Sequence, residues 1–290
     1  TEVTAGAARR RARLRLAAAG LEAADQEARI LLQHATGWDS TACLARERDP
    51  LPSEAAARLG ALVDRRAAHV PLAHLVGETA FHGVTLKVDA RALVPRSDTE
   101  AVVEAALDHL PVGRPSRIAD LGTGSGCLLL AILAARPDVT GIGLDRDRDA
   151  LALAQENVDR LGFGDRVELL ICDWGEWTGY AEADLIVSNP PYIRSDDIAA
   201  LDPVVRNADP IGALDGGRDG LDAYRVILAL AGKALKAGAW VILEIGADQA
   251  SDVTALLHAS GFVDCAVRRD LAGRDRVVLG RREHKLTGVS

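Results

Sequence analysis

Residues 117–126 carry the sequence Arg-Ile-Ala-Asp-Leu-Gly-Thr-Gly-Ser-Gly. The first five residues predict a buried strand, and the apolar residues 127–135 predict the helix that follows it. Between them, glycines at alternate positions let the backbone turn tightly and let a ligand approach without obstruction by Cβ atoms. The spacing is G-x-G-x-G, whereas dinucleotide-binding enzymes carry G-x-G-x-x-G. The pattern therefore indicates an α/β fold with a ligand site at the first strand-to-helix turn, although a purely structural turn of an α/β protein can carry the same glycines.

Strands and helices alternate from residue 117 onward. This alternation predicts right-handed crossovers and a mostly parallel sheet with helices on both faces. The strands are expected at 117–121, 139–144, 167–172, 184–188, 240–245, 263–268 and 276–279. Helices between them are expected at 127–135, 148–161, 223–236 and 249–260.

The first 76 residues have a different character, rich in Ala, Leu and Arg with apolar positions at helical spacing. Breaks near Gly20, Gly37 and Pro50 predict a small bundle of four or five short helices. Residues 77–95 then alternate around a glycine turn, as in a β-hairpin. We therefore expect a helical domain at 1–76, a β-hairpin linker at 77–95 and an α/β domain at 96–290.

Composition narrows the class of protein. The hydrophobic fraction of 48% is enough for a substantial core. The net charge of −8 and the pI near 5.4 argue against a general nucleic-acid-binding surface. A local basic cluster at residues 9–15 has the composition of a solvated helix face as much as of a binding patch. The four cysteines lack zinc or disulfide spacing and fit a reducing cytoplasm, and no stretch is long and apolar enough to span a bilayer.

Three acidic residues are expected at consecutive strand ends. Asp120 ends the first strand and Asp145 the second, where a carboxylate can accept hydrogen bonds from ribose hydroxyls. Asp173 ends the third strand and is followed by Trp174, a pair that suits an adenine amino group and its ring face. Carboxylates on one rim suit a cationic ligand better than a pyrophosphate. S-adenosyl-L-methionine, a sulfonium that carries adenosine, is such a ligand.

Residues 187–192 read Val-Ser-Asn-Pro-Pro-Tyr. They complete an apolar run that predicts a buried strand, so Asn189 is expected where the strand ends and its loop begins. Pro190 and Pro191 fix two φ angles and remove two N–H donors, which leaves a stiff turn with free carbonyl oxygens. A carboxamide, a carbonyl and the ring of Tyr192 are presented together. This combination suits a planar group that bears an –NH2, although a plain tight loop can carry the same prolines.

Residues 97–100 read Ser-Asp-Thr-Glu, the spacing of a capping box that starts a helix reaching about residue 110. Such a structural role explains Thr99 and Glu100 about as well as a place over the cofactor does. Arg96 is explained equally by a role in locking the domains together.

Three further features leave their roles open. Glu244 ends a predicted strand and is either an acid in the pocket or an ion-pair partner. Residues 215–220 contain three glycines and predict a flexible loop that closes over the substrate. His82 is expected to be a hairpin residue rather than a catalyst.

With these motifs in place, the chain resembles the HemK/PrmC family, the bacterial protein-(glutamine-N5) methyltransferases that act on class 1 peptide chain release factors. The resemblance covers nearly the whole chain. The segments that carry it are Pro71–Gly77, Val94–Glu100, Asp120–Gly126, Ser188–Ile193, Ala213–Leu221, Leu243–Gly246 and Asp270–Arg276.

The resemblance implies a seven-stranded, Rossmann-like class I methyltransferase domain that uses S-adenosyl-L-methionine, with the helical domain docking the substrate. Asn189, Pro190 and Tyr192 are the expected catalytic residues, and together with Pro191 they are expected to bind the substrate glutamine. No metal is expected. The expected cofactor-binding residues are Asp120, Gly122, Thr123, Gly124, Ser125, Gly126, Asp145, Asp173, Trp174 and Asn189.

Two other activities remain open. One is methylation of a glutamine in a ribosomal protein, against which the form Asp120-Leu121-Gly122 favours the release-factor branch. The other is methylation of exocyclic amino groups in DNA or RNA, which usually needs a basic groove and aromatic stacking, whereas aromatic residues are only 3% here. We further expect release factors as protein partners, no direct contact with nucleic acid or membrane, a monomer, and a cytoplasmic location.

Overall fold

The computed structural model describes residues 3–206 and 209–283, except for the side chains of residues 203 and 204. Within these ranges the chain forms two compact units. The smaller unit contains the residues up to Gly77 together with residues 202–206, and the larger unit contains the rest.

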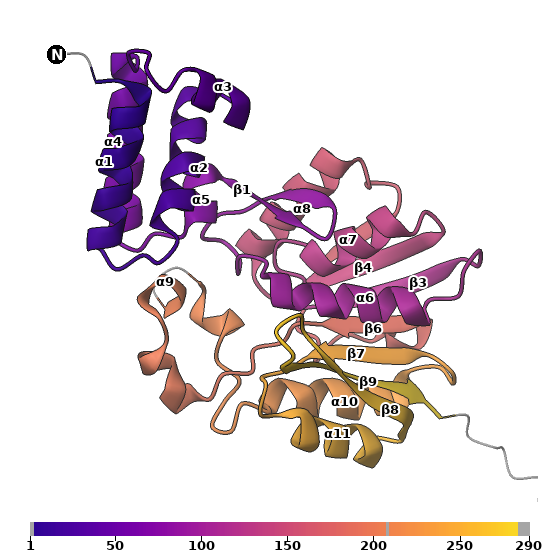
Figure 1. Cartoon of the computed structure of the whole chain (residues 1–290). Helices are drawn as coiled ribbons and strands as arrows, with labels where there is room; N and C mark the ends of the chain where they lie inside the picture. The colour runs from indigo at the N-terminus through magenta and orange to yellow at the C-terminus, as the bar shows by residue number, and fades with distance from the viewer. Residues whose placement is uncertain (1–2, 207–208, 284–290) are drawn as a thin grey trace, which may run out of the picture. The chain divides into compact units, whose positions relative to one another are not determined.

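The smaller unit is helical. Thr4 Oγ1 accepts a hydrogen bond from Ala7 N at the start of its first helix, and Gly37 ends the second in a left-handed conformation. The side chains of Arg66 and Glu27 form a buried ion pair, with N–O distances of 2.7 and 3.0 Å, that joins α2 to α4. The helices are α1 (Ala5–Ala18), α2 (Ala24–Thr36), α3 (Ser40–Ala45), α4 (Ser53–Ala67) and α5 (Leu72–Val76) (Figure 1).

A short helix, α9 (Pro203–Arg206), also belongs to the smaller unit, although in sequence it lies between two parts of the larger one. The chain leaves the larger unit after Leu201 and returns to it at Asp209. Sequence reasoning missed this excursion, because a helix of four residues has no periodic pattern to detect.

The larger unit is built on a seven-stranded sheet, which confirms the predicted fold class. The strand order is β5-β4-β3-β6-β7-β9-β8, in which β9 runs opposite to the other six described strands of this sheet. The strands are β3 (Ser116–Leu121), β4 (Val139–Asp145), β5 (Val167–Ile171), β6 (Leu185–Ser188), β7 (Trp240–Glu244), β8 (Phe262–Arg269) and β9 (Asp275–Arg282).

Helices cover both faces of this sheet (Figure 1). Successive strand residues point to opposite faces, so Ile118 packs in one apolar core and Ala119 in the other. The first core includes side chains of α6, α7 and α8, and the second includes side chains of α10 and α11. These helices are α6 (Glu100–His109), α7 (Cys127–Ala135), α8 (Arg148–Leu161), α10 (Asp222–Ala234) and α11 (Ala250–Ala259).

The hairpin formed by β1 (Glu78–Phe81) and β2 (Val84–Lys87) groups with the larger unit. Asn157 of α8 is fully buried and ties this hairpin down. Its Oδ1 accepts from Lys87 N at 2.7 Å, and its Nδ2 donates to Lys87 O at 3.0 Å and to Ser125 O at 2.9 Å. One side chain thereby joins the hairpin to the glycine-rich turn.

The predicted capping box at residues 97–100 is wrong. Residues 97–99 form a 3₁₀ turn, α6 begins at Glu100, and neither element has a side-chain cap. Glu100 Oε1 instead accepts a hydrogen bond from His82 N in the hairpin turn, at 2.8 Å. Glu100 thus binds a backbone amide that is distant in sequence instead of capping its own helix.

Three other 3₁₀ turns lie at Gly179–Glu182, Ser195–Ala200 and Ile211–Ala213. No helix in the described part of the chain has the length and apolar character needed to cross a membrane.

Candidate active site

A pocket of about 480 Å³ lies in the larger unit at the carboxyl ends of β3, β4 and β6. This is the edge at which open α/β sheets bind ligands. Most of the predicted site residues line it, namely Asp120, Gly122, Thr123, Gly124, Ser125, Asp145, Trp174, Asn189 and Pro191. The predicted residues outside this lining are Gly126, Asp173, Pro190 and Tyr192.

The glycine-rich turn follows β3 directly. Gly122 has a φ of 73°, and a Cβ added there would lie 3.0 Å from Cζ3 of Trp174. The indole therefore lies against bare backbone at this position. Gly124 N donates to Asp145 Oδ2 at 2.9 Å, which fixes the turn to the end of β4.

Asp120 is the most deeply buried acid of the pocket, with 1% of its surface exposed. Its Oδ2 accepts a hydrogen bond from the Thr123 hydroxyl at 2.7 Å. Its Oδ1 is buried and has no hydrogen-bond partner among the described residues. Burial raises the pKa of Asp120 from 3.8 to about 7, and the Asp145 carboxylate adds to the rise. A donor or positive charge supplied by a ligand would satisfy this carboxylate.

Of the other two predicted acids, Asp145 lines the pocket and Asp173 is outside its lining. Asp145 lies at the pocket, where Asp147 N donates to its Oδ1 at 2.9 Å, and burial raises its pKa. Asp173 Oδ1 accepts from Gly175 N at 2.8 Å, within the loop that carries Trp174. Its contact with a ligand stays a prediction.

The Asn-Pro-Pro-Tyr segment begins directly after β6, as predicted. Asn189 is half-buried at the pocket, and its Nδ2 donates to Thr99 Oγ1 at 3.4 Å. Pro190 is buried, and no N–H of the described residues donates to its carbonyl oxygen. The Tyr192 hydroxyl donates to Glu244 Oε1 at 3.2 Å. Two acceptors, one carboxamide and one carbonyl, are thus held on a stiff turn.

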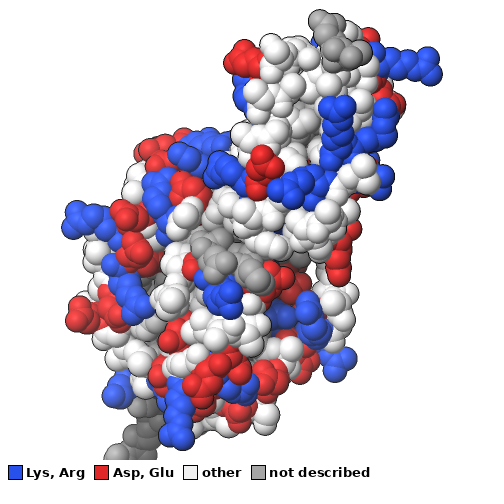
Figure 2. All heavy atoms as spheres, turned by 90° about the vertical axis from the view of Figure 1, so that its left-hand side faces the viewer, with Lys and Arg blue, Asp and Glu red and all other residues white. Residues whose placement is uncertain are grey.

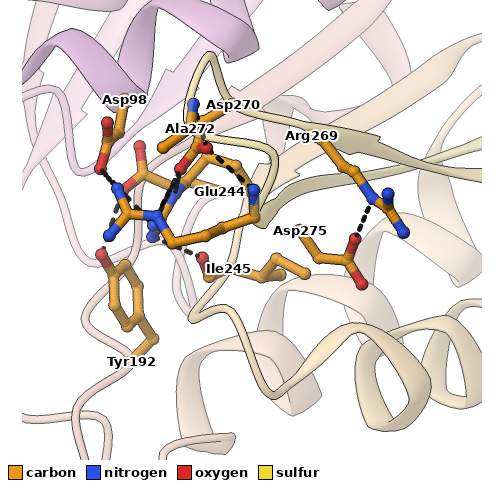
Figure 3. Close-up of polar contacts among 10 residues, drawn as sticks. Asp98, Tyr192, Glu244, Ile245, Arg269, Asp270, Ala272 and Asp275 are labelled. Carbon is orange, nitrogen blue, oxygen red and sulfur yellow. Dashed lines mark hydrogen bonds and ion pairs between the residues drawn. The ribbon is translucent and has the colours of Figure 1, made fainter.

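A cluster of charged side chains lies next to the hydroxyl end of Tyr192. Figure 3 shows Tyr192 pointing toward carboxylates that include Glu244, Asp98 and Asp270. Arg276 Nη2 lies 3.2 Å from Asp270 Oδ2 and 3.5 Å from Asp98 Oδ2, and its Nη1 donates to the carbonyl at the end of β7. Glu244 is therefore a buried acceptor for the Tyr192 hydroxyl beside these ion pairs, and it is not among the residues that line the pocket.

The loop at residues 215–220 was predicted to be a flexible cover, but it packs against the Asn-Pro-Pro-Tyr backbone. A Cβ on Gly216 would lie 2.8 Å from Pro191 O, and one on Gly220 would lie 2.4 Å from Tyr192 O. Gln249 Nε2 donates to the carbonyls of Tyr192 and Gly220, at 3.0 and 3.2 Å. These glycines allow two backbone segments to approach closely.

Two walls of the pocket were missed by sequence reasoning. They are residues 91–95, which follow the hairpin, and residues 210–213. Arg96 Nη2 pairs with Asp209 Oδ2 at 2.9 Å and so anchors the second wall. The prolines at 95 and 210 indicate loops rather than a site, and the family-like segments Val94–Glu100 and Ala213–Leu221 overlap each wall only at one end.

Charge on the surface is mixed. On the face of the larger unit seen in Figure 2, acidic and basic side chains are interspersed, and no continuous basic surface forms there. In the basic cluster of α1, Arg9 and Arg10 lie 3.8 and 3.6 Å from Glu47, and Arg15 lies 3.6 Å from Asp64. Part of that cluster is therefore neutralised within its own unit.

Known proteins match both parts of the chain. The PrmC N-terminal domain matches residues 7–77, and the methyltransferase small domain matches residues 99–210. The release factor glutamine methyltransferase of Cereibacter sphaeroides is 46% identical over 268 residues, or 92% of this chain and 94% of that protein. The protein of the same name from Agrobacterium fabrum is 42% identical, over 93% and 95%.

A solved structure, the release factor-specific protein-(glutamine-N5) methyltransferase of Alicyclobacillus acidocaldarius, is 32% identical to this chain. It covers 66% of this chain and 95% of its own, with a TM-score of 0.41. Given the identity and the near-complete coverage of the curated relatives, the chain belongs to the release factor glutamine methyltransferase family.

Proposed function

We propose that this chain transfers a methyl group from S-adenosyl-L-methionine to the side-chain amide nitrogen of the glutamine in the Gly-Gly-Gln motif of class 1 release factors. The observation that carries the proposal is an intact Asn-Pro-Pro-Tyr segment at the rim of a cofactor-sized pocket. Relatives named for this activity, at 42–46% identity over nearly the whole chain, support the substrate class.

The pocket fits the methyl donor. The unpartnered Oδ1 of Asp120 supports binding of a cationic ligand, and the Asp145 carboxylate, which lines the same pocket, would accept from ribose hydroxyls. The Trp174 indole packs against the bare backbone at Gly122 and lines the pocket, and its flat apolar ring suits contact with a purine. When bound, the donor supplies an electrophilic methyl group on its sulfonium. Asp173 remains a further candidate acceptor for the adenine amino group.

The chemical difficulty lies in the acceptor, because the lone pair of an amide nitrogen is delocalised into its carbonyl. Asn189 Oδ1 and Pro190 O can each accept one N–H of the substrate amide, which fixes the nitrogen and favours the positive charge that develops on it. Pro191 and the Tyr192 ring would form the walls that keep this amide in place. Rate acceleration then comes from positioning and electrostatics, and the proton leaves after the methyl group has been transferred.

The test uses labelled S-adenosyl-L-methionine and purified release factor, either unchanged or with the motif's glutamine replaced. Label is expected on the unchanged protein only. Equal labelling of both would contradict the substrate assignment, and label on ribosomal protein or RNA in parallel reactions would favour the two alternative activities. Asn189→Ala should remove most turnover and leave donor affinity, measured by calorimetry, nearly unchanged.

The remaining features are proposals of the same kind. The helical unit would dock the release factor, the boundaries at residues 76 and 95 would separate docking and catalytic parts, and the enzyme would act as a monomer in the cytoplasm. A size measurement in solution, with and without release factor, tests the monomer and the docking together.

A further inference from the structure

The Asn189 carboxamide can turn either its oxygen or its –NH2 toward the pocket, but only the oxygen can accept an N–H from a substrate amide. Its Nδ2 donates to Thr99 Oγ1. Thr99 is 2% exposed and lines the pocket. A threonine hydroxyl has one hydrogen and two lone pairs, so the direction of that hydrogen decides which end of Asn189 can pair with it.

Glu244 is the buried acid that can attract that hydrogen. It is 2% exposed at the end of β7, and its Oε1 accepts from the Tyr192 hydroxyl. Its Oε2 is buried and has no hydrogen-bond partner among the described residues. Burial raises the pKa of Glu244, and among the contacts that oppose this rise the Thr99 hydroxyl is the strongest. With its hydrogen drawn toward Glu244, Thr99 offers only a lone pair to Asn189.

We propose that Thr99 and Glu244 are positioning residues that fix the Asn189 carboxamide with Oδ1 facing the pocket. The same carboxylate holds the Tyr192 phenol, so one buried acid orients both ends of the Asn-Pro-Pro-Tyr segment. Arg276 Nη1 donates to the carbonyl of Ile245, directly after the strand end from which Glu244 projects, and Asp270 pairs with the same guanidinium. The inference rests on the proposed function, because it concerns the group that receives the substrate amide.

The test compares Thr99→Val, which keeps the shape and removes the hydroxyl, with Thr99→Ser, which keeps the hydroxyl. With release factor as substrate, kcat should fall at least about tenfold in T99V, because a misplaced reacting group can cost about 100-fold, whereas T99S should stay within about threefold. The Kd for S-adenosyl-L-methionine should stay within about twofold in both variants. Glu244→Gln should lower kcat in the same way.

A matched control is Thr254→Val in α11, where the hydroxyl is buried and has no partner among the described residues. Its kcat should equal that of the wild type. Equal kcat values for T99V and T99S would overturn the inference, as would a loss of donor affinity in T99V that accounts for its whole loss of turnover.

Failure of the proposed function gives a different result, namely a wild type that does not label release factor at all. The positioning role can then be tested without activity, by the exchange of the Asn189 side-chain amide hydrogens in ¹⁵N spectra. One Nδ2 hydrogen should be protected in the wild type and in T99S and unprotected in T99V. No protection in the wild type would overturn the inference.

Discussion

Asp120→Asn tests whether the buried carboxylate of the pocket opposes folding when no ligand is bound. Asp120 is 1% exposed, and burial raises its pKa from 3.8 to about 7. Asparagine has nearly the same size and can keep a hydrogen bond with Thr123, but it has no charge to desolvate. The substitution therefore removes the titration and leaves the packing nearly unchanged.

The sign follows from the direction of the pKa shift. Because the folded pKa is raised, the folded state binds the proton more tightly than the unfolded chain does, and stability falls as the pH rises. The loss begins near pH 3.8, is complete above about pH 7, and amounts to about 4 kcal/mol in the ligand-free protein. Of this contribution to the free energy of unfolding, about 1 kcal/mol is lost between about pH 6 and about pH 8.5.

The assay is urea unfolding of wild type and D120N at these two pH values, followed by the fluorescence of Trp174, Trp177 and Trp240 in the larger unit. Titrating groups that do not interact with Asp120 are common to both proteins and cancel in the double difference. From the lower pH to the higher, the wild type should lose about 1 kcal/mol more than the variant. A double difference of zero, or one of the opposite sign, would refute the raised pKa.

Two further substitutions probe the glycine-rich turn and its support. Gly122→Ala should weaken S-adenosyl-L-methionine binding about tenfold, since the left-handed backbone costs about 1–2 kcal/mol for a residue with a Cβ and the new atom would press on Trp174. Unchanged affinity in calorimetry would contradict the close contact. Asn157→Leu should lower the free energy of unfolding by about 3 kcal/mol, because the buried backbone groups of Lys87 and Ser125 lose their partners. A loss below about 1 kcal/mol in urea unfolding would show that those groups find other partners.

Local patterns predicted most of the sheet and its helices. Strands such as β3 and β4 are largely apolar runs, the first followed by Gly122 and the second ending at Asp145. The helix α8 has a capping Asp147 before it and Gly162 in a left-handed conformation after it. Both α7 and α8 have the predicted bounds. The motif-based site residues gather at one pocket because consecutive parallel strands end on the same edge of the sheet.

The predictions that failed, or that the sequence left open, concern side chains whose partners are distant in sequence. Glu100 has the local spacing of a cap, yet its carboxylate binds the amide of His82 in the hairpin. The sequence left open whether Glu244 lines the pocket. Only the folded structure shows that it is buried and accepts a hydrogen bond from the Tyr192 hydroxyl. Long-range contacts of this kind leave no periodic trace in a single sequence.

The excursion of the chain between Leu201 and Asp209 has a practical consequence for anyone who dissects this protein. No single cut yields two self-sufficient fragments, because a fragment that starts at Glu78 would still carry α9 without the helices it groups with. A clean catalytic fragment needs a second edit, a short glycine-rich bridge in place of residues 202–208. Its partner fragment, Thr1–Gly77, would have to be supplied with α9 as a separate peptide.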